Sequence, residues 1–292
     1  VPSEYATIQL AIDAATNGDT IYVSNGTYVE NINYNNKDLY LLGENRDSTI
    51  LDGNQNGSVV ILNGNSVIEG FTIQNGSGTS DGANFRGGGI YVNRSADTTY
   101  ILNCSIINNT MSLLTDTRGA GIYGNSSTYI DNCYIANNNC SQYASGTAVG
   151  YLSNCIFENN GGYACSWSKS IDNCLFINNG SRAIHSLTPS GTELGKVNNV
   201  TIINDFPRSS FYFGTNGANI SNLILINPTT GYHASTWDST LVNYSNISGG
   251  HLKFSNPTSS QFQNVIWGTG NIDLAPQFVD SANGDYTLVP GS

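Results

Sequence analysis

Short apolar segments that end in asparagine recur along this chain of 292 residues. The repeated phrase is an aliphatic or aromatic residue, any residue, Asn, and then Cys or another apolar residue. Its asparagines are Asn103, Asn132, Asn154, Asn173, Asn199, Asn222, Asn243 and Asn264. The phrase is constant whereas the intervals between successive asparagines range from 19 to 29 residues. This pattern predicts one structural unit that is repeated with loops of different length.

A second asparagine follows the first by five residues in most repeats. These second asparagines are Asn108, Asn137, Asn159, Asn178, Asn204 and Asn227, and Asn75 stands in the same relation to Gly70. Asparagine tolerates the left-handed backbone conformation that a sharp bend needs, and stacked amides can hydrogen-bond to one another. Each apolar run is therefore predicted to be a strand between two polar bends.

Each repeat from about residue 67 onward is expected to contain three short strands. One strand ends at the first asparagine, one lies between the two asparagines, and one follows a loop of variable length. Repeats of this length without helical periodicity match a parallel β-helix, in which equivalent residues of successive coils stack about 4.8 Å apart. The predicted fold class is an all-β solenoid with three sheets.

The first residues of the chain follow a helical pattern instead. Ile8, Ala11, Ile12 and Ala15 recur at helical spacing, and Gly18 follows as a stop signal. This segment is expected to form an amphipathic helix that covers one open end of the coils.

Composition supports one elongated domain. Only 11% of residues are charged, 32 are glycine and one is methionine, which is typical of tight turns and short strands rather than of helices. An unbroken repeat argues for a single solenoid rather than two domains. The expected organisation is a cap at residues 1–18, coils at 19–270 and a closing segment at 271–292.

The formal charge of −11 and the pI near 4.4 argue against nucleic acids and anionic membrane surfaces as partners, because both need a basic surface. No apolar run approaches the length of about 18 residues that spans a bilayer, so no membrane insertion is expected. The chain starts in folded-looking sequence without a signal peptide, as a mature product does. With its acidic, lysine-poor composition, we expect an extracellular or cell-surface location.

Four cysteines occupy the same position of successive repeats. They are Cys104, Cys133, Cys155 and Cys174. We predict that they stack as small buried hydrophobic side chains with free thiols. A disulfide between Cys140 and Cys165 stays open as an alternative.

Both ends of the chain carry a resemblance to known proteins. The opening segment, residues 2–31, and the ending, residues 271–292, resemble the terminal segments of secreted or surface-displayed microbial β-helix proteins. Together with the repeats, they resemble the pectate-lyase-like superfamily. The resemblance covers the whole chain and implies a single-stranded, right-handed parallel β-helix. The superfamily includes lyases, hydrolases, epimerases, phage spikes and adhesive proteins, so it leaves the activity open.

Candidate binding residues gather around the third strands. Four arginines stand in the loops just before these strands: Arg86, Arg118, Arg182 and Arg208. Strand alternation points the following side chains outward: Tyr91, Tyr123, Ser166, His185, Tyr212, Ser235 and Lys253. His233 falls at an inward or edge position of its strand. An outward row of this kind beside an arginine wall predicts a groove for an extended polysaccharide, and the resemblance implies the same sheet.

If the protein is an enzyme, β-elimination on a uronic-acid polymer is the favoured reaction. Arg182 or Arg118 would neutralise the substrate carboxylate, and His185, Tyr212 or Lys253 would act as the base. Among these residues His185 is the strongest single candidate, because it lies close to Arg182 in the sequence.

Asp81 and Asp116 are candidate metal ligands. They stand in the longer loops at 76–86 and 109–118, where their carboxylates and neighbouring amide oxygens would suit calcium or form an acid/base pair. Neither loop carries a recognisable calcium motif, so calcium is expected only as an option and no other cofactor is predicted.

A non-enzymatic role is the alternative. The paired aspartates of polygalacturonase-type hydrolases and the Trp-x-Asp-His run of pectate lyases are missing from the sequence. Net negative charge favours a surface, adhesive or filament-forming protein that associates with itself, whereas the arginines favour polysaccharide binding. From the sequence, both functions stay open.

Overall fold

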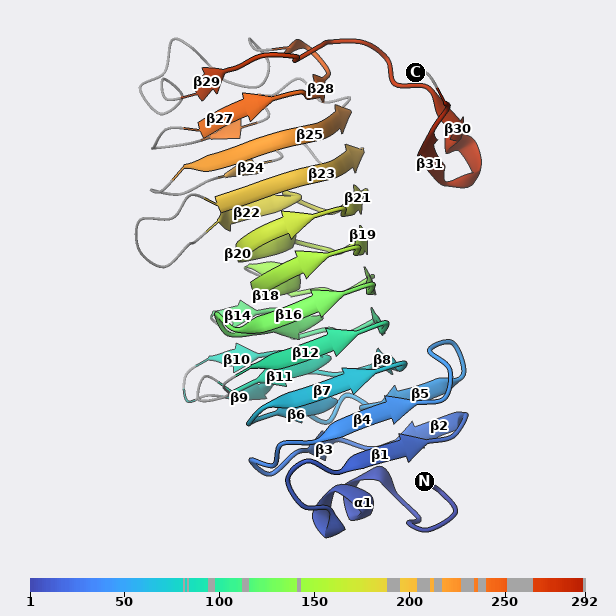
Figure 1. The fold of residues 1–292 in the computed structure, drawn as a ribbon. Helices are drawn as coiled ribbons and strands as arrows, with labels where there is room; N and C mark the ends of the chain where they lie inside the picture. Colours follow the sequence, from blue (N-terminus) through green and yellow to red (C-terminus); the bar gives the residue numbers. More distant parts are fainter. Residues whose placement is uncertain are drawn as a thin grey trace.

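A computed structural model shows one elongated stack of coils, with the N-terminal helix at one end and the closing segment at the other (Figure 1). The structure describes residues 1–80, 82, 84–93, 98–111, 116–140, 143–187, 195–203, 211–212, 217–226, 234–235, 240–250 and 265–290. Side chains of Val149, Ser186, 211–212 and 234–235 are outside this description. The chain is a right-handed parallel β-helix, as the sequence predicted.

The coils build three parallel sheets. The first contains β1 (Thr20–Val23), β4 (Tyr40–Gly43), β7 (Ser66–Glu69), β12 (Thr99–Leu102), β16 (Thr128–Asp131), the later parts of β18 (Ala144–Ser153) and β20 (Tyr163–Asp172), the earlier parts of β23 (Gly195–Ile203) and β25 (Ala218–Ile226), β27 (Thr240–Asn243) and β29 (Val265–Trp267).

The second sheet contains β2 (Gly26–Val29), β5 (Thr49–Asp52), β8 (Thr72–Gln74), β13 (Ser105–Ile107), β17 (Tyr134–Ala136), β19 (Ile156–Glu158), β21 (Leu175–Ile177), the later parts of β23 and β25, and β28 (Asn246–Ile247). The third contains β3 (Ile32–Asn33), β6 (Val60–Leu62), β11 (Ile90–Val92), β15 (Ile122–Tyr123), the earlier parts of β18 and β20, β22 (Ile184–Leu187), β24 (Phe211–Tyr212) and β26 (Ala234–Ser235).

Alternation along each strand places one row of side chains inside the coils. In the third sheet, for example, Ile90 pairs with Ile122, and both are fully buried. Each such side chain contributes about 1.5–3 kcal/mol by leaving water. The core is therefore a set of parallel stacks that run the length of the molecule.

The predicted asparagine bends adopt left-handed backbone conformations. The first asparagines Asn103, Asn132, Asn154, Asn173, Asn199 and Asn222 have φ between 45° and 53°. The second asparagines Asn75, Asn108, Asn137, Asn159 and Asn178 have φ between 52° and 58°. Because asparagine enters this region at little cost, both bends can be sharp in every coil.

A buried amide ladder lies one residue after the second bend. Asn109, Asn138, Asn160 and Asn179 are fully buried, and each side-chain Nδ2 of the first three donates to the Oδ1 of the next, at 3.0–3.1 Å. Stacked amides were expected at the bends themselves, and they also occur there. There the ladder is mostly solvent-exposed, as between Asn173 and Asn154 (2.6 Å).

The register corrects the alignment of the repeat phrase at Asn243. Ser221 pairs with Asn243, so Tyr244, and not Asn243, occupies the bend position equivalent to Asn222. Tyr244 accordingly has the left-handed φ of 48°. The last phrase lies outside the described residues except for Val265, which pairs with Thr240 and begins β29.

All six cysteines are buried free thiols. The four repeated cysteines belong to the main core, as predicted, while Cys140 packs with Met111 and Ala120 in a separate small cluster. The alternative disulfide between Cys140 and Cys165 is therefore not formed.

The cap is the helix α1 (Ile8–Ala14), in which Ile8, Ala11 and Ile12 are buried against the first coils. Its N-cap is Thr7, whose hydroxyl accepts from the Leu10 amide. The closing segment crosses the other end and ends in the antiparallel pair β30 (Phe278–Asp280) and β31 (Asp285–Leu288), joined by the 3₁₀ turn η1 (Ser281–Asn283) (Figure 1). No helix among the described residues is long and apolar enough to cross a membrane.

Candidate functional site

The predicted outward row of the third sheet exists in one continuous register. Pairing runs through Tyr91, Tyr123, Ala148, Ser166, His185, Tyr212 and Ser235. Tyr123 and Ser166 are nevertheless buried, and Tyr91 and His185 are half-buried. Side chains from neighbouring loops and strands therefore cover part of this row.

The loops beside the sheet carry a small sheet of their own. Strand β10 (Phe85–Arg86) pairs in parallel with β14 (Thr117–Arg118) and in antiparallel with β9 (Thr79–Ser80). This pairing places Arg86 opposite Arg118 in successive coils. Two of the four predicted arginines thus lie together, on one flank of the third sheet.

Asp116 lies between these two guanidinium groups. Its carboxylate accepts from Arg118 Nε at 2.7 Å and from Arg86 Nη2 at 3.2 Å. Burial opposes ionisation, but the hydrogen bonds and charges of Arg86 and Arg118 outweigh it and lower the pKa of Asp116 below its ordinary value. With its side-chain amide turned to match its neighbours, Asn84 donates to Asp116 Oδ2 (3.0 Å) and accepts from Arg86 Nη2 (3.2 Å).

Arg86 is 2% exposed and also donates to the Asp116 carbonyl oxygen at 2.8 Å. Its guanidinium lies over the Tyr123 ring, 5.3 Å from the centroid. A polymer on the surface cannot reach a side chain this buried. Arg86 therefore holds the loop in place and does not line the wall of a groove, which corrects the expectation from the sequence.

Arg118 remains 29% exposed and packs against two aromatic rings. Its guanidinium carbon lies 4.9 Å from the Tyr143 ring centroid and 4.7 Å from that of Trp167. These rings and the bidentate contact with Asp116 hold the guanidinium in one orientation.

Trp167 reaches this surface through an unusual backbone conformation. Simple alternation in β20 would point Trp167 inward, because Ser166 before it points outward. Trp167 instead has φ of 56°, and its half-buried ring packs on the surface against Arg118 and Tyr143. A left-handed conformation is costly for a bulky residue and marks a candidate functional position. Sequence alternation gave no signal for it.

His185 stands in an aromatic environment. Its imidazole stacks on Tyr163, with centroids 4.1 Å apart and planes at 7°, and meets Trp167 edge-on at 6.2 Å. Its Nδ1 lies 3.3 Å from Ser166 Oγ. Burial, followed by the charge of Arg182, lowers the pKa of His185 from 6.5 to about 4. The imidazole is therefore neutral above about pH 5.

Arg182 completes this group from the loop before β22. It is half-buried, and its guanidinium carbon lies 5.7 Å from the Tyr163 ring centroid. We call the four rings of Tyr143, Tyr163, Trp167 and His185 the aromatic platform. One arginine lies against each side of it, Arg118 beside Tyr143 and Trp167, and Arg182 beside Tyr163.

Several predicted residues lie outside the described part of the chain. They are Asp81, Arg208, His233 and Lys253. Tyr212 is placed only by the pairing of its backbone with His185. Asp116 faces two guanidinium groups, a positive environment that disfavours calcium. Among described residues, no cluster of three or more His, Cys, Asp or Glu side chains is arranged to hold a metal.

No protein-family model matches the chain, and the comparison with curated proteins finds no match. Solved structures similar to it include the pectin methylesterase from carrot (12% identity, 97% of this chain and 93% of that chain, TM-score 0.45). Two others are the pectin methylesterase PemA from Erwinia chrysanthemi (14%, 97% and 94%, 0.43) and that from Yersinia enterocolitica (14%, 93% and 82%, 0.40). These proteins share the parallel β-helix fold with this chain. The class defined here is thus a β-helix protein with an aromatic and cationic surface on its third sheet.

Proposed function

We propose that this protein is a secreted or cell-surface polysaccharide-binding β-helix whose binding surface is the aromatic platform and its two arginines. The observation that carries the proposal is the gathering of four half-buried rings with Arg118 and Arg182 on one face. Sugar rings present C–H faces that pack on aromatic rings, and their hydroxyl groups and carboxylates bind polar groups at the rim.

The charge of the site favours an acidic polysaccharide. Asp116 neutralises much of the charge of Arg86 and Arg118, and Arg182 adds a third guanidinium beside Tyr163 and His185. The platform is thus locally cationic on a protein whose net charge is −11. A guanidinium beside a stacked sugar would bind a uronate carboxylate through paired hydrogen bonds.

β-Elimination on a uronic-acid polymer is the catalytic form of the same proposal. The base would take the proton at C5, the electron pair would form the C4–C5 double bond, and O4 would leave and take a proton from water. His185 is neutral and near Arg182, which favours this role. Its low pKa makes it a weak base, so the geometry supports binding better than elimination.

The binding proposal is tested with Trp167→Asn. Asparagine accepts the left-handed backbone at this position and removes only the ring. We expect affinity for polygalacturonate or alginate, measured by isothermal titration calorimetry, to fall about tenfold, as the loss of one aromatic contact would give. Tyr129→Ala is the control, because Tyr129 is 36% exposed and its ring stacks on Tyr151, but it lies on the first sheet, away from the platform.

Equal affinity of the wild type and the Trp167→Asn variant would contradict the proposal that the aromatic platform binds the polysaccharide. The same samples are assayed for unsaturated products by ultraviolet absorbance, with and without added calcium. Product formed by the wild type and lost in His185→Gln supports elimination. Binding without any unsaturated product would support polysaccharide binding and contradict β-elimination.

A further inference from the structure

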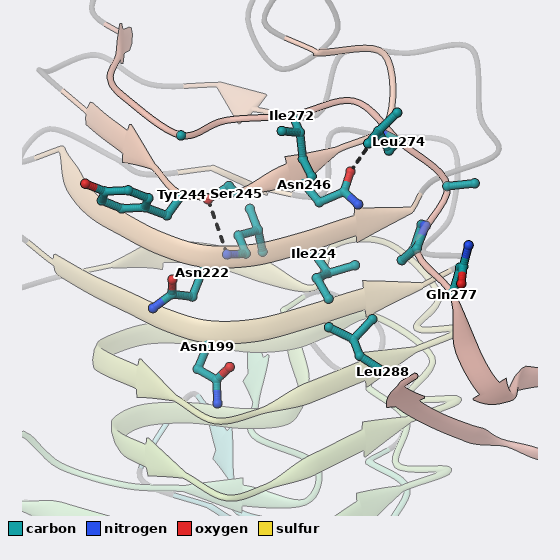
Figure 2. Close-up of a pocket in the computed structure, with 14 residues that line it drawn as sticks. Asn199, Asn222, Ile224, Tyr244, Ser245, Asn246, Ile272, Leu274, Gln277 and Leu288 are labelled. Atoms are coloured by element: carbon teal, nitrogen blue, oxygen red, sulfur yellow. Dashed lines mark hydrogen bonds between the residues drawn. The ribbon is translucent and has the colours of Figure 1, made fainter. Parts of the chain in front are cut away.

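A second candidate ligand site lies far from the aromatic platform, under the closing segment. A cavity of about 370 Å³ is formed between the outer side of the second sheet and residues 272–277. This volume falls within the range of about 300–1,000 Å³ that is usual for small-molecule sites. Its apolar wall includes Ile224, Leu274 and Leu288 (Figure 2).

Tyr244 stands at one end of this cavity, in the position that asparagine occupies in the preceding coils. Figure 2 shows Tyr244, Asn222 and Asn199 one below another on successive coils. The φ of Tyr244 is 48°, close to the 53° of Asn222 and the 51° of Asn199. This conformation is energetically unfavourable for an aromatic residue, whereas asparagine adopts it readily.

The ring of Tyr244 is nevertheless 64% exposed, so burial does not offset the strain. Gly270 leaves room for the ring, because a Cβ atom at this position would lie only 2.4 Å from Tyr244 Cδ1. The ring therefore rests directly on the Gly270 backbone, beside the cavity. A strained, exposed and supported ring at the edge of a cavity is the arrangement expected of a ligand contact.

The exposed side-chain amide bonds end at Asn222, one coil before Tyr244. In earlier coils, one amide donates to the oxygen of the amide before it, as Asn199 Nδ2 does to Asn173 Oδ1 at 2.8 Å. Asn222 Nδ2 donates to Asn198 Oδ1 at 2.9 Å, but no amide follows at Tyr244 to donate to Asn222 Oδ1. Among described residues this oxygen therefore remains an acceptor that faces solvent at the cavity edge.

The rim of the cavity is polar but uncharged. Its amides come from Asn199, Asn222, Asn246 and Gln277, and no Asp, Glu, Lys or Arg side chain lines it. Asp273 lines an adjoining cavity of about 480 Å³, which shares Leu274 and Pro276 with the first. An anionic ligand would meet this carboxylate and the negative net charge of the protein.

We propose that this cavity binds a sugar unit of a neutral saccharide, stacked on Tyr244 and hydrogen-bonded by the rim amides. A neutral sugar has an apolar C–H face for the tyrosine ring and the aliphatic wall. Its hydroxyl groups donate to Asn222 Oδ1 and exchange hydrogen bonds with Gln277. This site is independent of the platform on the third sheet, which takes acidic sugars.

The variant Tyr244→Asn tests the proposal, because it places in this coil the residue that six earlier bends carry. The probes are cello-, xylo-, manno- and galacto-oligosaccharides of six units, titrated into the full chain by calorimetry. We expect one of them to bind the wild type and to bind Tyr244→Asn at least about tenfold more weakly. The midpoint of thermal unfolding should be unchanged or higher, since backbone strain is removed.

Two further variants show which site is responsible. Tyr244→Phe keeps the ring and should retain binding, while Tyr22→Asn removes a 70% exposed ring at the other end of the molecule and should have no effect. Trp167→Asn should leave neutral-saccharide binding intact even if it abolishes binding of acidic polymers. No binding of any neutral probe at millimolar concentration, or equal binding by Tyr244→Asn, would overturn the proposal.

Discussion

The imidazole of His185 stacks face to face on the phenol ring of Tyr163, with centroids 4.1 Å apart. The two residues come from successive coils, and Arg182 lies against the same tyrosine. This packing removes water from the imidazole and brings a positive charge near it. The packing of the fold therefore favours the neutral form of His185 by lowering its pKa.

The free energy of unfolding should decrease as the pH is lowered, because His185 titrates at a different pH in the folded and the unfolded chain. Burial, and then the charge of Arg182, lower its folded-state pKa to about 4 from the ordinary 6.5. As pH falls from 6.5 to 4, the unfolded chain binds the proton first, so the free energy of unfolding decreases. The loss amounts to about 3 kcal/mol over this range. Urea unfolding of the wild type and His185→Gln at pH 7 and pH 4 measures this loss of unfolding free energy. An equal pH dependence of the two proteins would contradict the role of His185.

Replacing Asp116 by Asn should destabilise the protein by about 2–3 kcal/mol, because it leaves the buried guanidinium of Arg86 without its carboxylate. Asp47→Asn is the matched control. Asp47 pairs with Arg46 at the surface, where it is 81% exposed, and its loss should cost less than about 0.5 kcal/mol. Chemical denaturation of both variants distinguishes the two ion pairs. Similar small losses in both would show that Asp116 does not hold Arg86.

Asn138→Ala should cost about 3 kcal/mol. The Asn138 side chain donates to Asn160 Oδ1 and to the Ile106 carbonyl, and accepts from Asn109, all in the buried ladder. Its removal leaves these groups unsatisfied in the core. Asn132→Gly, at an exposed bend with φ of 52°, should change the free energy of unfolding by less than about 1 kcal/mol. A reversed order in a denaturation experiment would refute the assignment of the ladder.

Thiol reagents should not modify the folded protein. All six cysteines are buried and free, and burial raises the pKa of Cys104 to about 12. Reaction needs an exposed thiolate. Mass spectrometry after alkylation should find no label on the native chain and six labels in denaturant. Rapid labelling of the native protein would show that the cysteine stack opens.

The repeat architecture was predictable from local sequence. Apolar alternation sets which side chains enter the core, and asparagine tolerates the two left-handed bends, so the outward row that contains Tyr91 and His185 followed directly from the pattern. The buried amide ladder at Asn109 and Asn138 lies one residue from the predicted one. That offset depends on how successive coils stack, which spacing alone does not specify.

Single-sequence patterns also misaligned the last coils. The phrase around Asn243 looks like the earlier ones, but pairing with Ser221 moves the bend to Tyr244. Two readings of the same short motif differ by one residue, and only hydrogen bonding to the neighbouring coil decides between them.

The sequence by itself determined the β-helix, its capping helix, the stack of free thiols and the third sheet, which carries His185 and is flanked by the loops of Arg118 and Arg182. Only the tertiary structure decided that Asp116 joins Arg86 to Arg118, that Trp167 turns outward and that Tyr244 borders a cavity. Periodicity is a local property that each strand carries in its own residues. Contacts between loops, and strained backbone conformations, depend on residues that are distant in sequence and come together only when the coils stack.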